Sequence, residues 1–128
     1  MAPALRSYRE LRVWRVGVQL VALVYQITRQ FPRTESFGLA SQMQRAAVSI
    51  PANIAEGYGR THRGDYLRHL SVANGSLKEL ETEMFVATRL GYLTPATSRE
   101  FFRIAGQLGR MLRLLAKRLA HSPPHPTP

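Results

Sequence analysis

The sequence predicts an all-α protein, an antiparallel up-down-up-down four-helix bundle over residues 1–120 with a disordered, Pro-rich tail over residues 121–128. Apolar residues recur at steps of three and four along four segments, which is the period of an amphipathic helix. No segment alternates apolar and polar residues with the period of two that a half-buried strand requires. Short polar stretches join the segments, and short connections favour antiparallel neighbours in a bundle.

The first predicted helix covers about Arg9–Gln30. Ser7 and Glu10 have the spacing of a capping box, and Pro32 ends the helix. The helix is apolar on two nearly opposite sides, one with Leu11, Trp14, Val18, Val21, Ala22 and Tyr25, the other with Val13, Val16, Leu20, Leu23, Val24 and Ile27. A helix that is apolar on two sides is buried on two sides. We therefore expect the bundle to cover one face and another subunit to cover the second.

The second predicted helix covers about Leu39–Glu56 and contains Pro51. Its apolar face keeps helical spacing through the proline, with Leu39, Met43, Ala46, Ile50 and Ile54. A mid-helix proline removes one hydrogen bond and clashes with the carbonyl four residues back, here that of Ala47, at a cost of about 3 kcal/mol. The pattern thus predicts a kink or a break at Pro51.

The third and fourth predicted helices cover about Arg63–Leu90 and Ala96–Ala120. The third has a heptad pattern typical of left-handed bundle packing, made by Tyr66, Leu70, Ala73, Leu77, Leu80, Met84 and Ala87. Thr94 and Pro95 provide an N-cap and a proline at the first helical position of the fourth. Its apolar face consists of Phe101, Ile104, Ala105, Leu108, Met111, Leu112, Leu115, Ala116 and Leu119.

The chain has 128 residues and no cysteine, which excludes disulfides, thiol catalysis and Cys-ligated metals. The absence of a signal-peptide pattern favours the cytoplasm, and the longest apolar stretch is too short and too polar for a membrane span. His62 and His69 are seven residues apart and have no carboxylate partner at ligand spacing. We expect no catalytic residue, no metal, no cofactor, no small-molecule substrate and no membrane partner.

Positive charge is concentrated at the two ends of the chain. The net charge is +10, and sixteen of the 18 cations are arginine. Residues 1–33 and residues 92–128 each carry a net +5, whereas residues 34–91 are neutral overall. Such a balance favours a polyanionic partner, most often nucleic acid. The alternative interpretation is a GC-rich genome that prefers arginine codons.

The fourth predicted helix carries a stripe of cations opposite its apolar face. At 100° per residue the stripe spans an arc of about 80° and contains Arg99, Arg103, Arg110, Arg113 and Lys117. Glu100 is predicted to point away, so that no acid neutralises the stripe. Aligned cations repel one another, and a phosphate backbone would fit them, with sequence-independent, salt-dependent binding. A solvated polar face is the alternative.

Two further features bear on nucleic-acid binding. Arg9, Arg12 and Arg15 add charge at the start of the first helix. Aromatic residues that would stack on bases are sparse, and the best exposed candidates are Tyr58, Tyr92 and Phe102. The pattern therefore favours contacts to the backbone over reading of bases.

Several motifs within residues 8–118 resemble a known family. They include Leu11-Arg12-Val13-Trp14, Phe31-Pro32, Gly38-Leu39-x-Ser41-Gln42, the run Arg45–Gly57 with its SIPxNIAEG core, Gly75-Ser76-Leu77-x-Glu79-Leu80-Glu81-Thr82, and Arg89-Leu90-Gly91-Tyr92. The chain in these parts resembles the four-helix-bundle family of 23S rRNA intervening-sequence proteins. The resemblance implies an antiparallel bundle that forms a homopentamer and binds nucleic acid. A related branch resembles the accessory protein of diversity-generating retroelements, which serves a reverse transcriptase and its RNA.

The signature residues are Arg45, Ser49, Pro51, Asn53, Glu56, Gly57 and Glu81. We expect a structural polar network, in which Arg45 and Asn53 meet Glu81 or Glu56 and satisfy backbone groups freed at Pro51. The sequence thus predicts a non-enzymatic, oligomeric protein that binds RNA or DNA through its Arg-rich helix faces. The alternative is a protein-interaction scaffold or an accessory subunit of a reverse transcriptase.

Overall fold

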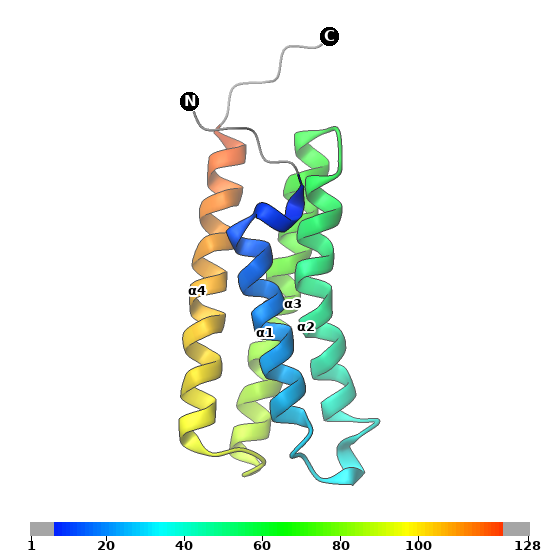
Figure 1. Cartoon of the computed structure of the whole chain (residues 1–128), viewed down its shortest axis with the longest axis vertical. Coiled ribbons are helices and arrows are strands. Elements are labelled where there is room, and N and C mark those ends of the chain that lie inside the picture. The colour runs from blue at the N-terminus through cyan, green and yellow to red at the C-terminus, as the bar shows by residue number, and fades with distance from the viewer. Residues whose placement is uncertain (1–6, 122–128) are drawn as a thin grey trace.

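Four long helices pack as the corners of a square in the computed structural model, which describes residues 7–121. The elements are η1 (Tyr8–Glu10), α1 (Arg12–Thr28), η2 (Arg33–Glu35), α2 (Leu39–Tyr58), α3 (Arg63–Arg89) and α4 (Pro95–Ala120). Adjacent helices run in opposite directions (Figure 1). Within residues 7–121, the backbone of each helix lies close to that of the next along the chain, and α1 lies close to α4, whereas the backbones of the diagonal pairs stay apart. The all-α prediction is confirmed.

The helix boundaries match the prediction closely except at the start of the chain. Ser7 caps the turn η1, accepting a hydrogen bond from the Arg9 backbone N–H at 3.1 Å. Leu11 then adopts an extended conformation, so α1 begins at Arg12 rather than Arg9. The predicted disordered tail lies outside the described residues, apart from His121.

Pro51 does not break α2, which continues from Leu39 to Tyr58 (Figure 1). The buried proline ring faces α1 at Gly17, where an added Cβ would lie 3.5 Å from the Pro51 Cβ. Because glycine leaves room for the ring, packing against α1 offsets the hydrogen bond that the proline cannot donate to Ala47. The predicted break at Pro51 is therefore wrong, because α2 is one uninterrupted helix, and the predicted kink stays a prediction.

One apolar core runs between the four helices. Its fully buried larger side chains are Leu20, Val24, Met43, Ile50, Ile54, Leu70, Leu77, Leu80, Met84, Phe101, Leu108 and Leu112. The heptad pattern of α3 is buried as predicted, except that Tyr66 is half-buried. No helix among residues 7–121 is both long enough and apolar enough to span a bilayer.

The two apolar sides of α1 have different environments. The side with Val13, Val16 and Leu20 lies in the core. On the other side, Trp14 packs edge-on against Tyr8 with ring centroids 5.2 Å apart, while Val18 and Tyr25 stay exposed. The bundle thus covers one face, as predicted, and cover of the second by another subunit stays a prediction.

At Gly57, α2 packs tightly against α3, and we predict that Gly57→Ala destabilises the bundle by about 1–3 kcal/mol. An added Cβ would lie 2.8 Å from the His69 Cβ and 3.0 Å from the Tyr66 ring, so the helices would have to separate. The matched control is Gly75→Ala, since an added Cβ there meets nothing within 4 Å. That control should gain about 0.5–1 kcal/mol from helix propensity. Urea unfolding of both variants measures the difference, and equal effects would contradict the close approach.

Candidate nucleic-acid interface

The five cations of the predicted stripe on α4 are exposed, and one of them, Arg103, is paired. Arg103 donates from Nε to Glu100 Oε2 at 3.1 Å and from Nη2 to Glu100 Oε1 at 2.7 Å. These hydrogen bonds lower the pKa of Glu100 and raise the pKa of Arg103. The prediction that Glu100 points away was wrong, because side chains three residues apart on a helix reach each other.

The other four cations of the predicted stripe, Arg99, Arg110, Arg113 and Lys117, have no hydrogen-bond or ion-pair partner within residues 7–121. Two glycines of α4, Gly106 and Gly109, leave room for two of these side chains to lie against the helix. The Arg110 Nη1 lies 3.5 Å from where a Cβ of Gly106 would be, and the Arg113 Nη1 lies 3.4 Å from the same position at Gly109. The two guanidinium groups therefore fold back over a helix surface that carries no side chain.

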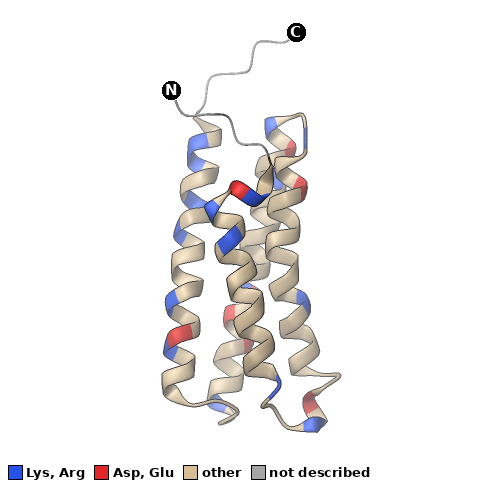
Figure 2. Ribbon diagram, in the orientation of Figure 1, with Lys and Arg blue, Asp and Glu red and all other residues tan. Residues whose placement is uncertain are grey.

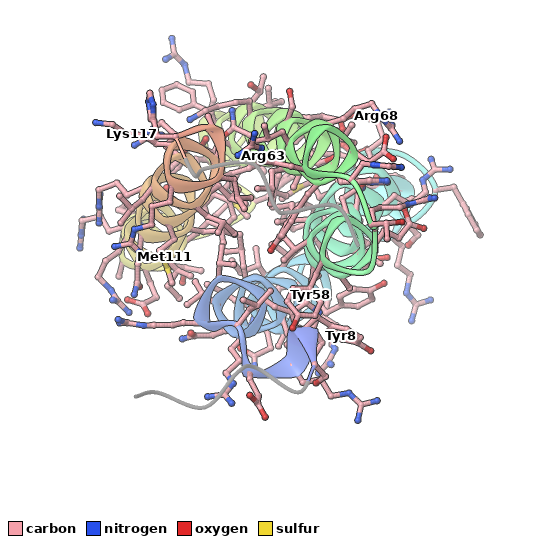
Figure 3. The ribbon with its side chains drawn as sticks, turned by 90° about the horizontal axis from the view of Figure 1, so that it is seen from above. Tyr8, Tyr58, Arg63, Arg68, Met111 and Lys117 are labelled. Carbon is pink, nitrogen blue, oxygen red and sulfur yellow. The ribbon has the colours of Figure 1, made fainter. Side chains whose placement is uncertain are left out.

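The tertiary structure joins the two basic ends of the chain. Arg9, Arg12 and Arg15 are exposed at the start of the chain, and Arg15 Nε donates to the Arg9 carbonyl at 2.9 Å. Because α1 and α4 are antiparallel and in contact, these residues lie at the same end of the bundle as the C-terminal half of α4 (Figures 1 and 2). Figure 3 places Lys117 on the outer side of α4. We call Arg9, Arg12, Arg15, Arg110, Arg113 and Lys117 the basic face; Arg99 and Arg103 lie nearer the other end of α4.

The aromatic residues predicted to be exposed are all half-buried. Tyr58 packs edge-on against Tyr66, Tyr92 donates from its hydroxyl to Glu35 Oε2 at 3.1 Å, and Phe102 contacts the Phe101 ring at a centroid distance of 5.0 Å. Phe37 is instead 99% exposed. Its place between Ser36 and Gly38 in a connecting loop was the only sequence signal for this exposure.

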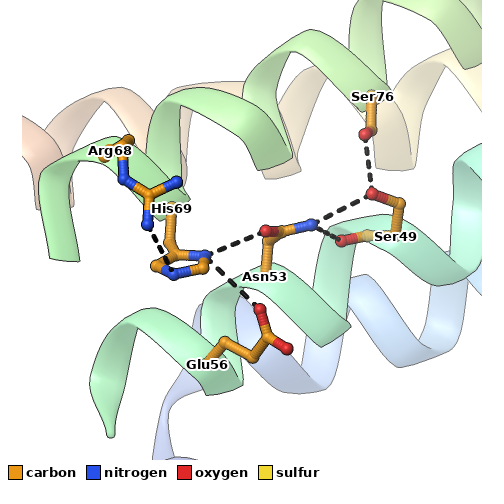
Figure 4. A network of polar contacts seen from close by, with 6 residues as sticks. All are labelled: Ser49, Asn53, Glu56, Arg68, His69 and Ser76. Atoms are coloured by element: carbon orange, nitrogen blue, oxygen red, sulfur yellow. Dashed lines mark hydrogen bonds and ion pairs between the residues drawn. The ribbon is translucent and has the colours of Figure 1, made fainter. Parts of the chain in front are cut away.

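A second polar site lies between α2 and α3, and we call it the polar seam: Ser49, Asn53, Glu56, His69 and Ser76 (Figure 4). Asn53 Nδ2 donates to the Ser49 carbonyl at 2.8 Å and to Ser49 Oγ at 3.1 Å. The two hydroxyl oxygens of Ser49 and Ser76 are 2.8 Å apart. Since the Asn53 amide nitrogen faces Ser49, its Oδ1 accepts from Nδ1 of His69 at 3.0 Å.

His69 is the residue of the polar seam that sequence reasoning missed. It is 5% exposed, its Nδ1 lies 3.5 Å from Glu56 Oε2, and its Nε2 lies 3.4 Å from Arg68 Nη2. With Nδ1 donating to Asn53, Nε2 of the neutral ring is free to accept from Arg68. The position of His69, next to Leu70 of the heptad pattern, is the sequence signal that it lies at the edge of the core.

The predicted polar network is therefore correct for Asn53 and Glu56 but not for its other two members. Glu81 pairs with Lys78 at 3.0 Å on its own helix, and Arg45 is exposed and takes no part in the seam. The network satisfies the Ser49 carbonyl, not the Ala47 carbonyl that loses its donor at Pro51. Its members come from both helices, so it fixes the register of α2 on α3.

Glu83 is a buried acid near the other end of the same helix pair. It is 8% exposed, and its Oε1 has no hydrogen-bond partner. Burial, and secondarily the charge of Glu79, raise the pKa of Glu83 from an ordinary 4.5 to about 7. In the described part of the chain, no three His, Asp or Glu side chains gather as a metal site would require.

Fold and charge together define a small, basic four-helix-bundle protein with a structural polar seam. The chain belongs to the 23S rRNA-intervening sequence protein family, whose sequence model matches residues 9–114. No curated protein sequence matches this chain.

A solved structure supports the same fold. It is the crystal structure, at 1.70 Å resolution, of a protein of unknown function from the S23 ribosomal protein family of Bacteroides thetaiotaomicron VPI-5482. The TM-score is 0.77 at 20% sequence identity, and the match covers 82% of this chain and 98% of that chain. At this identity the likeness shows the fold.

We predict that Asn53 and His69 are energetically coupled. His69→Ala leaves Asn53 Oδ1 without its donor and should cost about 1–3 kcal/mol of unfolding free energy. A double-mutant cycle with Asn53→Ala, followed by urea unfolding, should give a coupling energy of about 0.5–3 kcal/mol. The control Glu81→Ala removes only a surface ion pair and should change stability by less than about 0.5 kcal/mol. A coupling energy near zero would show that the seam does not act as a unit.

We also predict that Glu83→Gln removes a pH dependence of stability. Between pH 4.5 and about 7 the folded protein keeps a proton on Glu83 that the unfolded chain releases. The unfolding free energy of the parent protein should therefore fall as the pH rises through this window. At pH 8 the Gln variant should be more stable by on the order of 2 kcal/mol, and at pH 4 the two should agree. Urea unfolding at both pH values tests this. The control variant Glu81→Gln should show the same fall in unfolding free energy with rising pH as the parent protein.

Proposed function

We propose that this chain is a non-enzymatic, cytoplasmic protein that binds RNA or DNA through its basic face and acts as a homo-oligomer. The observation that carries the proposal is that exposed cations from both ends of the sequence lie at one end of the bundle, on the neighbouring helices α1 and α4. A ring of five is the assembly that the family resemblance implies. The apolar side of α1 that the bundle leaves uncovered supports an assembly of several copies.

The charge distribution across the square supports a polyanionic partner. Six of the eight acids lie in residues 34–91, which include all of α2 and α3, while residues 1–33 and 92–128 each carry a net +5. The bundle therefore has a basic side and a neutral side. A field of this kind orients the protein toward a polyanion during the encounter and speeds association.

The side chains of the basic face favour phosphates over bases. Arginine presents a planar fork of donors that matches phosphate oxygens in a bidentate way. Arg110, Arg113 and Lys117 have no acidic partner in residues 7–121, so a phosphate would not have to displace one. The aromatic rings next to Arg9 and Arg15 in the described part of the chain, Tyr8 and Trp14, are half-buried, so binding should be nearly independent of sequence.

The test is the salt dependence of binding to a labelled RNA duplex and to a single strand of the same length. Each phosphate that a cation neutralises contributes about 0.7–0.9 to the slope of log affinity against log salt concentration. The triple variant Arg110→Gln, Arg113→Gln, Lys117→Gln should therefore lower the slope by about 2–3 and weaken binding at least about tenfold at low salt. Fluorescence anisotropy between 50 and about 300 mM salt measures both quantities.

The matched control is Arg29→Gln, Arg33→Gln, Arg45→Gln, which removes the same charge from exposed positions elsewhere. It should leave the slope nearly unchanged. Equal losses in both triple variants would show that net charge alone drives binding and that the basic face is not the site. No binding even at low salt would overturn the nucleic-acid proposal and favour the alternative, a protein-interaction scaffold or an accessory subunit of a reverse transcriptase. A pull-down that survives nuclease treatment would identify that alternative.

A further inference from the structure

A polar cavity of about 250 Å³ lies between α2 and α3, next to the polar seam. We call it the signature pocket, because several of the sequence motifs that carry the family resemblance contribute to it. Its lining residues are Gln42, Arg45, Ala46 and Ser49 on α2, and Ser76 and Glu79 on α3. Ser49 and Ser76 also belong to the polar seam. Neither the seam nor the basic face gives a role to the other three polar residues, Gln42, Arg45 and Glu79.

The side chains of Gln42, Arg45 and Glu79 are exposed at the rim of the signature pocket. Within residues 7–121 they form no hydrogen bond and no ion pair. Arg45 and Glu79 carry opposite charges and line the same cavity, yet they do not contact each other. The cavity thus keeps a positive and a negative group apart, and a ligand that enters between them does not have to break an ion pair.

The half-buried floor of the signature pocket has one hydroxyl proton without an acceptor. Ser49 Oγ and Ser76 Oγ are 2.8 Å apart and share one hydrogen bond (Figure 4). Ser49 Oγ also accepts from Asn53 Nδ2 at 3.1 Å. Two hydroxyl groups have two protons, and only one of these lies between the two oxygens. No other acceptor in the described part of the chain binds the second proton, so it is available to a ligand.

This set of groups favours a small ligand that carries both charges. Glu79 repels an anion and Arg45 repels a cation, so neither a phosphate nor a simple amine suits the whole cavity. A guanidinium group matches a carboxylate in a bidentate way, and a carboxylate accepts strong hydrogen bonds from an ammonium group. A free α-amino acid carries a carboxylate and an ammonium group on one carbon atom. Its zwitterion is therefore complementary to the two separated charges.

We propose that the signature pocket binds a free α-amino acid as its zwitterion. The carboxylate of the ligand accepts from the Arg45 guanidinium and from the serine hydroxyl at the floor, and its ammonium group donates to Glu79. Gln42 and Ala46 are left to contact the side chain of the ligand, which must be small in a cavity of about 250 Å³. The α2–α3 edge lies opposite the α1–α4 edge with the basic face, so this site is separate from the proposed nucleic-acid interface.

The experiment is an NMR titration of the isotope-labelled whole chain with L-serine. The backbone amide shifts around Ser49 and Ser76 should change saturably, with a dissociation constant of about 1 mM or lower. Acetate supplies only the carboxylate and methylamine only the ammonium group, so each should bind at least about tenfold more weakly than L-serine. Equally strong binding of acetate would show an anion site and overturn the inference.

Two variants test the assigned contacts, since Arg45→Gln and Glu79→Gln each remove one charge from an exposed position of the pocket. Each should weaken L-serine binding at least about tenfold, because a hydrogen bond to a charged group is lost. The matched controls Arg33→Gln and Glu81→Gln remove the same charges outside the cavity and should keep the affinity of the parent protein. In urea unfolding, L-serine should raise the unfolding free energy of the parent and of both controls, but not of the two pocket variants.

Two further results would overturn the inference. One is the absence of saturable shifts with both L-serine and glycine, which carries the same two charges without a side chain. The other is full L-serine affinity in Arg45→Gln and Glu79→Gln. Neither result bears on nucleic-acid binding, which depends on the cations of α1 and α4. A chain that bound no RNA should still bind L-serine, so the two proposals fail separately.

Discussion

Helix α2 approaches both of its neighbours at positions where one partner has no Cβ. Pro51 faces Gly17 on α1, and Gly57 faces Tyr66 and His69 on α3. These two close contacts determine how near α2 lies to α1 and to α3. In this arrangement Asn53 binds the Ser49 carbonyl on its own helix and the His69 ring on α3. Because a buried network is stabilising only when every member has its partner, the polar seam then holds α2 in one register on α3.

The antiparallel arrangement also determines where the positive charge of the chain lies on the bundle. A bundle of four helices with short loops brings the start of the first helix beside the end of the last. In this chain those two segments are the basic ones, so their charges add on one side of the molecule. The neutral middle of the chain forms the opposite side.

Much of the fold could be predicted from the sequence, because helical periodicity and caps are local properties. The heptad pattern of α3 and the Thr94 cap of α4 fall where they were expected, and Thr94 Oγ1 accepts from the Thr97 N–H at 3.2 Å. The break predicted at Pro51 was wrong, because the cost of a proline depends on what packs against its ring. The pair of Glu100 and Arg103 was missed, because a helical wheel ignores the length of the side chains.

By itself the sequence determined the four helices, the apolar stripe of each, the excess of arginine at both ends and the family. Each of these depends on residue type and spacing along the chain. Only the tertiary structure decided that α2 continues through Pro51, that His69 completes the network of Asn53, and that Phe37 is fully exposed. It also decided that the two basic segments lie at the same end of the bundle. These features depend on contacts between residues far apart in sequence, or on their absence, and such contacts exist only once the helices have packed.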